Sequence, residues 1–266
     1  MFVFKKPRLG LAGVMCTPFR GDKEGNYSGD VQALEELAAE YDFEFLPITE
    51  GIYNLDQART AARELDEWGA DFIILQTSSF ASGDFIYPFT KLTAKLGLWS
   101  VPEGFPTSEG GLPLNSFTAS NLYNSIIRTT PTDYQKPVKW FFGHPSQPLF
   151  DQRLEITVQA LRALVNLPGK KIALIGGVAP SFDNLIIDYQ KPRDLLGIEV
   201  IEFDLEQVLY IARALDPSQL DQTMNEISSS VKSVQGGDSE ALEKTARTYL
   251  AIQALAKEHQ LEGIAL

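Results

Sequence analysis

The stretch Asp71-Phe72-Ile73-Ile74-Leu75 decides the fold class, because four apolar residues follow one another after its first position. Successive side chains of a strand point to opposite faces, so an uninterrupted apolar run predicts a strand that is buried on both faces. Sheets covered on both faces are typical of α/β proteins, in which helices connect parallel strands. We therefore expect a parallel sheet, covered by helices, around residues 71–75.

Four similar runs lie in the first 145 residues, at positions 9–16, 43–48, 98–101 and 138–142. Segments between them show the apolar spacing of amphipathic helices. Ser28 or Asp30 is expected to cap the first helix, and Asn54 with Gln57 resembles a capping box at the start of the second. Five strands separated by helices predict a doubly wound, flavodoxin-like three-layer α/β domain over residues 1–145.

The alternation begins again near residue 146, which predicts a second Rossmann-like α/β domain with a parallel sheet over residues 146–266. Its expected strands cover 171–175 and 198–203, and its expected helices cover 151–167, 181–196, 205–215, 217–231 and 239–259. Pro192 should break or kink the helix over 181–196, because proline lacks the amide hydrogen that a helix interior needs.

Residues 263–266 (Gly-Ile-Ala-Leu) resemble the start of one more buried strand. Ligands of open α/β sheets bind beyond the carboxyl ends of strands, and the loop that would follow this strand does not come next. We therefore expect the second domain to be truncated at its C-terminal end and the chain to be the front part of a longer protein. The alternative is a terminal edge strand over 264–266.

Composition and charge exclude several classes of function. The 266 residues are 44% hydrophobic and 22% charged, which is typical of globular domains, and 23 Lys and Arg against 35 Asp and Glu give a net charge of −12. Such an acidic protein is a poor partner for nucleic acid or an anionic membrane. One cysteine, Cys16, excludes an internal disulfide framework and a cysteine zinc site. Without a signal peptide or a spanning apolar run, a cytoplasmic protein is expected.

Arg20 is the first candidate for ligand binding, because it follows the first predicted strand at the edge where open α/β sheets bind ligands. Its guanidinium could face a ligand oxygen, or it could pair in solvent with Asp22 or Glu24. Gly176-Gly177 lacks the GxGxxG spacing of a dinucleotide site. His144, in a turn after the fifth strand, is expected to be structural or exposed. No nucleophile–base–acid set and no His-carboxylate metal cluster can be assembled, so we name no catalytic and no metal-ligating residues.

Two polar loops follow the third and fourth predicted strands. The loop 76–84 (QTSSFASGD) carries four hydroxyl groups and leads into a helix expected to end at Leu96. A hydroxyl-rich loop ahead of a helix can hold a phosphate, as in flavin mononucleotide binding, or a sugar. The loop 113–121 (PLNSFTASN) could recognise a polyol through its amide and hydroxyl groups. Ordinary capping of the following helix is the alternative for both loops.

The chain resembles the N-terminal two domains of the L-fucose isomerase / L-arabinose isomerase-like proteins. The resemblance rests on motifs whose order and spacing span nearly the whole chain: Pro18-Phe19-Arg20, ADFIIL at 70–75, Pro113 to Ser116, KIALIGG at 171–177 and TARTYLAIQALAK at 245–257. It implies two stacked Rossmann-like domains, followed in the full family by a third domain.

The resemblance also implies an activity, namely the interconversion of aldoses and ketoses with the help of a divalent metal, commonly manganese (Mn2+). The metal ligands would correspond to positions beyond Leu266, so this chain alone is expected to be inactive and to bind no metal. Family members assemble their sites between subunits, which implies a homo-oligomer, a trimer or a hexamer, with a small-molecule sugar as substrate. By position, the expected sugar contacts are Arg20, Asp84, Asn115 and Asn121.

Two alternatives to an isomerase remain open on the sequence. The first is a flavodoxin-like module that binds flavin or another phosphate ligand through Thr77 to Ser79. The second is a non-catalytic sugar-binding or scaffold protein. Flavin colour would distinguish the first, and sugar binding without metal would favour the second.

Overall fold

The computed structural model describes residues 4–19, 25–105, 108, 114–129, 137–230 and 238–266. The chain divides into two compact units, Met1–Asn166 and Leu167–Leu266. Within the described ranges, no helix is long and apolar enough to cross a membrane.

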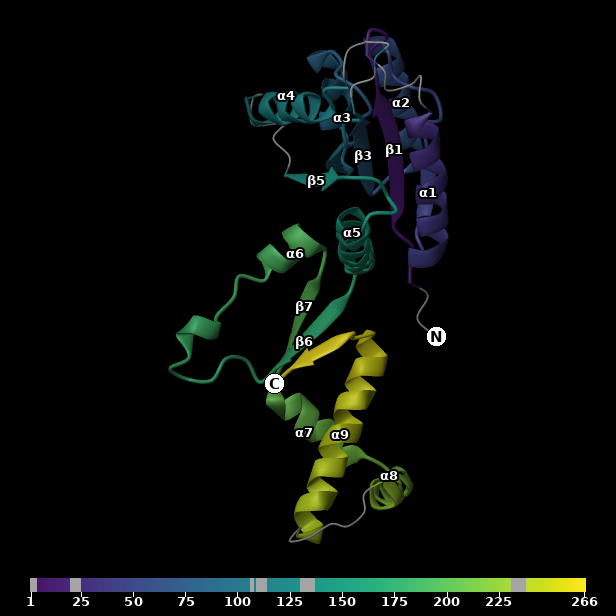
Figure 1. The fold of residues 1–266 in the computed structure, drawn as a ribbon. Coiled ribbons are helices and arrows are strands. Elements are labelled where there is room, and N and C mark those ends of the chain that lie inside the picture. Colours follow the sequence, from purple (N-terminus) through teal and green to yellow (C-terminus); the bar gives the residue numbers. More distant parts are fainter. Residues whose placement is uncertain (1–3, 20–24, 106–107, 109–113, 130–136, 231–237) are drawn as a thin grey trace. The chain divides into compact units, whose positions relative to one another are not determined.

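A five-stranded parallel sheet forms the centre of the first unit (Figure 1). Its strands are β1 (Arg8–Val14), β2 (Glu44–Pro47), β3 (Phe72–Thr77), β4 (Lys95–Ser100) and β5 (Val138–Phe142). They lie in the order β2-β1-β3-β4-β5, and each neighbouring pair is parallel. This is the flavodoxin-like order, which reverses direction between β1 and β3. All residues of the central strand β3 are buried, as its apolar run predicted.

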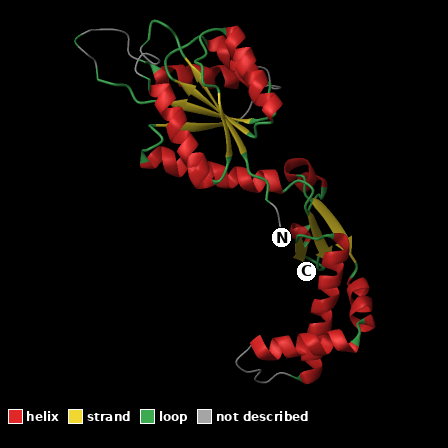
Figure 2. Cartoon of the chain, turned by 90° about the vertical axis from the view of Figure 1, so that its right-hand side faces the viewer, coloured by secondary structure: helices red, strands yellow, loops and turns green. Residues whose placement is uncertain are grey.

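Helices cover both faces of this sheet, as Figure 2 shows. One face carries α1 (Asn26–Tyr41) and α5 (Pro148–Asn166), and the other carries α2 (Leu55–Trp68), the 3-10 turn η1 (Gly83–Ile86), α3 (Tyr87–Thr90) and α4 (Ser116–Thr129). Alternate residues of β3 serve the two cores: Ile74 packs toward α1 and α5, whereas Ile73 and Leu75 pack toward α2 and α4. The predicted α/β class is confirmed.

The division between the units follows Asn166, whereas the sequence predicted a boundary after residue 145. The difference is α5, whose Phe150, Leu154 and Val158 pack in the core formed by β1, α1 and β3. This helix therefore belongs to the first unit.

Two predicted details of the first unit are wrong and one is confirmed. Helix α1 begins at Asn26 without a side-chain cap, so Ser28 and Asp30 both lie inside the helix instead of capping it. The helix expected to end at Leu96 is shorter than predicted. Helix α3 ends at Thr90, and Leu96 is buried in β4. The predicted cap of α2 is confirmed, since the Asn54 side chain accepts a hydrogen bond from the Gln57 amide at 2.9 Å.

The second unit contains a three-stranded parallel sheet in the order β7-β6-β8. Its strands are β6 (Lys171–Ile175), β7 (Glu199–Phe203) and β8 (Gly263–Ala265). Helices α7 (Leu205–Ala214) and α9 (Ser239–His259) share a core with this sheet, and α8 (Pro217–Ser230) packs against α9. These strands and helices confirm the predicted α/β pattern of the unit.

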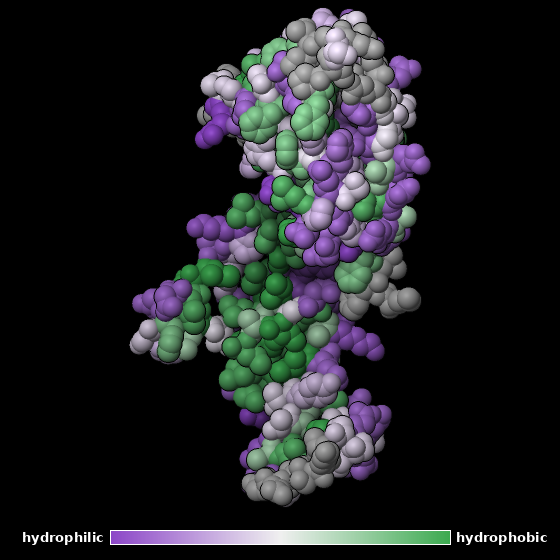
Figure 3. All heavy atoms as spheres, in the orientation of Figure 1, coloured by the Kyte–Doolittle hydropathy of each residue, from purple (hydrophilic) through white to green (hydrophobic). Residues whose placement is uncertain are grey.

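The segment between β6 and β7 differs from the prediction of one helix over 181–196. It holds a 3-10 turn, η3 (Asp183–Leu185), and a short helix, α6 (Gln190–Leu196). Pro192 lies in the first turn of α6, where a missing amide hydrogen breaks no helical bond. Several apolar side chains of this segment are exposed, among them Ile186 and Leu195. Figure 3 shows a broad apolar area on the visible face of the second unit.

Candidate functional site

Buried polar side chains collect beneath the carboxyl edge of the five-stranded sheet. Gln76 and Thr77 end β3, and Ser78 and Ser79 follow directly, all four being almost completely buried. Because side chains alternate along a strand, Gln76 points toward α1 whereas Thr77 points toward α4, as their hydrogen bonds show. Two separate networks result, one on each face of the sheet.

The first network, which we call the acidic network, consists of Asp30, Gln76, Ser78 and His144. The Gln76 amide nitrogen donates to Asp30 Oδ2 at 2.8 Å, and the Ser78 hydroxyl donates to Gln76 Oε1 at 2.5 Å. The other carboxylate oxygen of Asp30 lies 3.3 Å from His144 Nδ1. Burial raises the pKa of Asp30, and the hydrogen bonds and charge from His144 and Gln76 only partly oppose this rise.

The His144 ring links this network to the surface. Asp30 is 4% exposed, whereas the His144 side chain is 41% exposed. An ionised carboxylate can only accept, so Nδ1 of His144 carries the proton that faces Asp30 and Nε2 is the remaining ring nitrogen. The sequence predicts a structural or exposed histidine at this position and gives no sign of its link to Asp30.

The backbone around His144 is fixed by the turn that follows β5. Gly143 has a φ of 105°, and its amide donates to the Ser100 carbonyl. The Trp99 indole donates to the Gly143 carbonyl at 2.8 Å. The His144 amide donates to the Gln147 side chain at 3.0 Å. These hydrogen bonds fix the backbone that carries the His144 ring.

The second network, which we call the hydroxyl network, consists of Thr77, Ser100, Ser116 and Ser120. The Thr77 hydroxyl lies 2.8 Å from the Ser120 hydroxyl and 2.9 Å from the Ser116 carbonyl, and the Ser100 hydroxyl donates to Ser120 at 2.7 Å. The Ser116 hydroxyl accepts the Val101 amide at 2.8 Å. These bonds tie β3 and β4 to the start of α4.

The hydroxyl groups of Thr77, Ser78 and Ser79 therefore already have partners inside the protein. The Ser79 hydroxyl accepts the Cys16 amide at 2.9 Å, and the other two belong to the networks above. A phosphate ligand at Thr77 to Ser79 would have to displace these bonds. The geometry gives the flavin or phosphate alternative no support.

The described sugar-contact candidates, Asp84, Asn115 and Asn121, are not members of either network. Arg20 falls outside the described residues. Asp84 is half-buried in η1, and its Oδ1 atom has no hydrogen-bond partner within the described part of the chain. Asn115 precedes α4 with a φ of 52°, and Asn121 is exposed on α4. In the described ranges no hydrogen bond joins these three side chains, so their role as a group stays a prediction.

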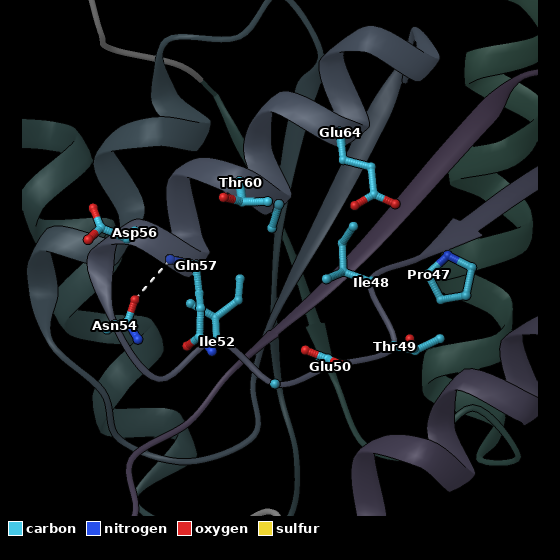
Figure 4. Close-up of a pocket in the computed structure, with 12 residues that line it drawn as sticks. Pro47, Ile48, Thr49, Glu50, Ile52, Asn54, Asp56, Gln57, Thr60 and Glu64 are labelled. Atoms are coloured by element: carbon cyan, nitrogen blue, oxygen red, sulfur yellow. Dashed lines mark hydrogen bonds between the residues drawn. The ribbon is translucent and has the colours of Figure 1, made fainter.

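A pocket of about 620 Å³ lies next to β2, at the start of α2 (Figure 4). Its polar lining consists of Thr49, Glu50, Asn54, Asp56, Gln57, Thr60 and Glu64. Carboxylate, amide and hydroxyl groups of this kind can bind the hydroxyls of a sugar. This pocket is not apparent from the sequence, where Asn54 and Gln57 are explained locally as a helix cap.

The part of the chain that the structure describes contains no group of three or more His, Cys, Asp or Glu side chains that could hold a metal ion. The second histidine, His259, lies with its ring 4.9 Å from that of Phe203 in the second unit. We therefore assign no metal ligands among the described residues.

Comparison with known proteins finds two relatives of limited similarity. No family model matches the chain. Two curated proteins do match it, the sulfoquinovose isomerases of Priestia aryabhattai and Priestia megaterium. Each is 26% identical over 199 residues, which is 74% of this chain and 43% of the relative. The chain is similar to a sugar isomerase. It spans less than half the length of these relatives, and the narrower resemblance to L-fucose and L-arabinose isomerases stays a prediction.

Proposed function

We propose that this chain is part of an aldose–ketose isomerase of carbohydrate metabolism, and that its first unit contributes contacts to the sugar. The match to sulfoquinovose isomerases over 199 residues carries the proposal. The carboxyl edge of the five-stranded sheet supports it, since a half-exposed imidazole after β5 and a polar pocket after β2 both offer hydrogen-bonding groups at the edge where α/β sheets bind ligands.

The substrate of the whole protein is, by this proposal, a sugar such as sulfoquinovose, converted between its aldose and ketose forms in the cytoplasm. Such a reaction moves a proton between two adjacent carbons and polarises their oxygens, which a divalent metal, Mn2+ by the family resemblance, would assist. The residues described here are assigned to binding and orienting the sugar. We propose a homo-oligomer in which this edge faces a site completed by other parts of the assembly.

A chimera tests the proposal directly. This chain would replace the matched segment of the Priestia megaterium sulfoquinovose isomerase, and conversion of sulfoquinovose to its ketose would be followed by NMR in the presence of Mn2+. We expect the chimera to isomerise the sugar and the 266-residue chain alone to be inactive. A folded chimera without activity, beside an active parent enzyme in the same assay, would refute the proposal.

A further inference from the structure

The acidic network contains His144, a basic side chain, at a sheet edge whose other described loop residues include no basic side chain. The described loop residues at the carboxyl edge of the first sheet are 15–19, 48–54, 78–82, 101–105, 114–115 and 143–147. Among them, His144 is the single basic side chain. In a chain of net charge −12, an anionic ligand at this edge therefore has one described group to pair with.

The imidazole is held in a way that suits binding a ligand. Nδ1 faces the buried carboxylate of Asp30, and Asp30 is itself held by Gln76. A ring fixed through one nitrogen presents the other in a defined direction. The nearby titratable group on α1, Tyr27, stays neutral, because burial raises its pKa well above the ordinary value.

We propose that His144 binds the anionic group of a sulfonated sugar through Nε2, and that Asp30 is its positioning residue. The inference rests on the proposed function and deepens it. Sulfoquinovose is a hexose whose C6 carries a sulfonate, so the substrate named for both curated relatives has the required negative charge. A charge-assisted hydrogen bond from an imidazolium to such an oxygen is stronger than a neutral one.

Two sugars that differ only in the sulfonate separate this contact from ordinary sugar binding. The 266-residue chain, labelled with 15N in its two histidines, would be titrated with sulfoquinovose and with 6-deoxyglucose, and the His259→Gln variant would assign the signals. We expect sulfoquinovose to shift the Nε2 signal of His144, and 6-deoxyglucose to leave it unchanged. Equal shifts with both sugars, or no shift with either, would overturn the assignment.

Affinity gives the second measurement. His144→Gln should weaken sulfoquinovose binding roughly ten- to hundredfold, the range expected for losing a hydrogen bond to a charged group, while 6-deoxyglucose binding stays unchanged. His259→Gln is the matched control and should bind as the wild type does. Asp30→Asn should weaken binding less than His144→Gln does, and it should reduce the shift that sulfoquinovose causes in the Nε2 signal of His144, which a merely structural role would not do.

The active chimera distinguishes failure of this inference from failure of the proposed function. In it, His144→Gln should raise KM for sulfoquinovose roughly ten- to hundredfold. A chimera that isomerises sulfoquinovose with an unchanged KM after His144→Gln would overturn the role of His144 and leave the proposed function standing. An inactive chimera would remove the proposed function itself.

Discussion

The acidic and hydroxyl networks lie beneath the same sheet edge, on opposite faces of β3. The hydroxyl network is neutral and closed, since the side chains of Thr77, Ser100 and Ser120 are completely buried and bond to one another. The acidic network holds a buried carboxylate and reaches the surface through His144. A cluster of hydroxyls in a sequence is therefore a poorer guide to a ligand site than one buried charge with an exposed partner.

Breaking the hydroxyl network should have the largest effect on stability. Thr77→Val keeps the size of the side chain but removes a buried hydroxyl that lies within hydrogen-bonding distance of the Ser120 hydroxyl and of the Trp99 and Ser116 carbonyls, which should lower the free energy of unfolding by about 2 kcal/mol. Urea unfolding followed by circular dichroism would measure it. Thr118→Val, at an exposed position of α4, is the matched control and should change little. If both variants lost the same stability, the network would not hold β3 to α4.

The acidic network should show itself in the pH dependence of stability. Burial raises the pKa of Asp30 in the folded protein, so the folded state holds this proton more tightly than the unfolded state does. The stability from this group is complete below the unfolded pKa of about 3.9 and is lost as pH rises through the folded pKa.

Asp30→Asn removes that dependence because asparagine cannot ionise. We expect its unfolding free energy to be within about 1 kcal/mol of the wild type at pH 7, because the lost bond to His144 is offset by the lost burial of charge. Relative to the variant, the wild type should gain stability as the pH is lowered toward about 4. Asp56→Asn, at an exposed position, is the control. Parallel pH profiles of wild type and Asp30→Asn would contradict this expectation.

His144→Gln should have the smallest effect on stability, less than about 0.5 kcal/mol, because the ring is partly exposed. Thermal unfolding at pH 7 would test this, with the effect on sugar affinity measured separately. A large loss of stability would show that His144 stabilises the turn after β5. The acidic network would then be structural, as the hydroxyl network is.

The fold followed from the sequence because its signals are local. The apolar run of β3 indicated burial on both faces, and the cap of α2 depended on residues only three positions apart. The strand order and the packing of α5 depend on contacts between distant segments, which a pattern along the chain does not contain.

The acidic network was missed for the same reason. Asp30 and His144 are 114 positions apart. One local signal was available: Asp30 shares a helical face with Leu34 and Ala38, both buried, so a carboxylate stood on the apolar side of a predicted helix. A buried charge in that position requires a hydrogen-bonding or charged partner, whereas the cap interpretation placed Asp30 at the helix end.

The hydrogen bond between Trp99 and Gly143 allows tryptophan fluorescence to report on the turn after β5. The indole of Trp99 is fully buried, and its nitrogen donates to the carbonyl of the residue directly before His144. The other two tryptophans, Trp68 and Trp140, are half-buried. With both replaced by phenylalanine, the fluorescence of Trp99 becomes a single intrinsic probe whose wavelength and quenching register any displacement of the turn when a ligand binds.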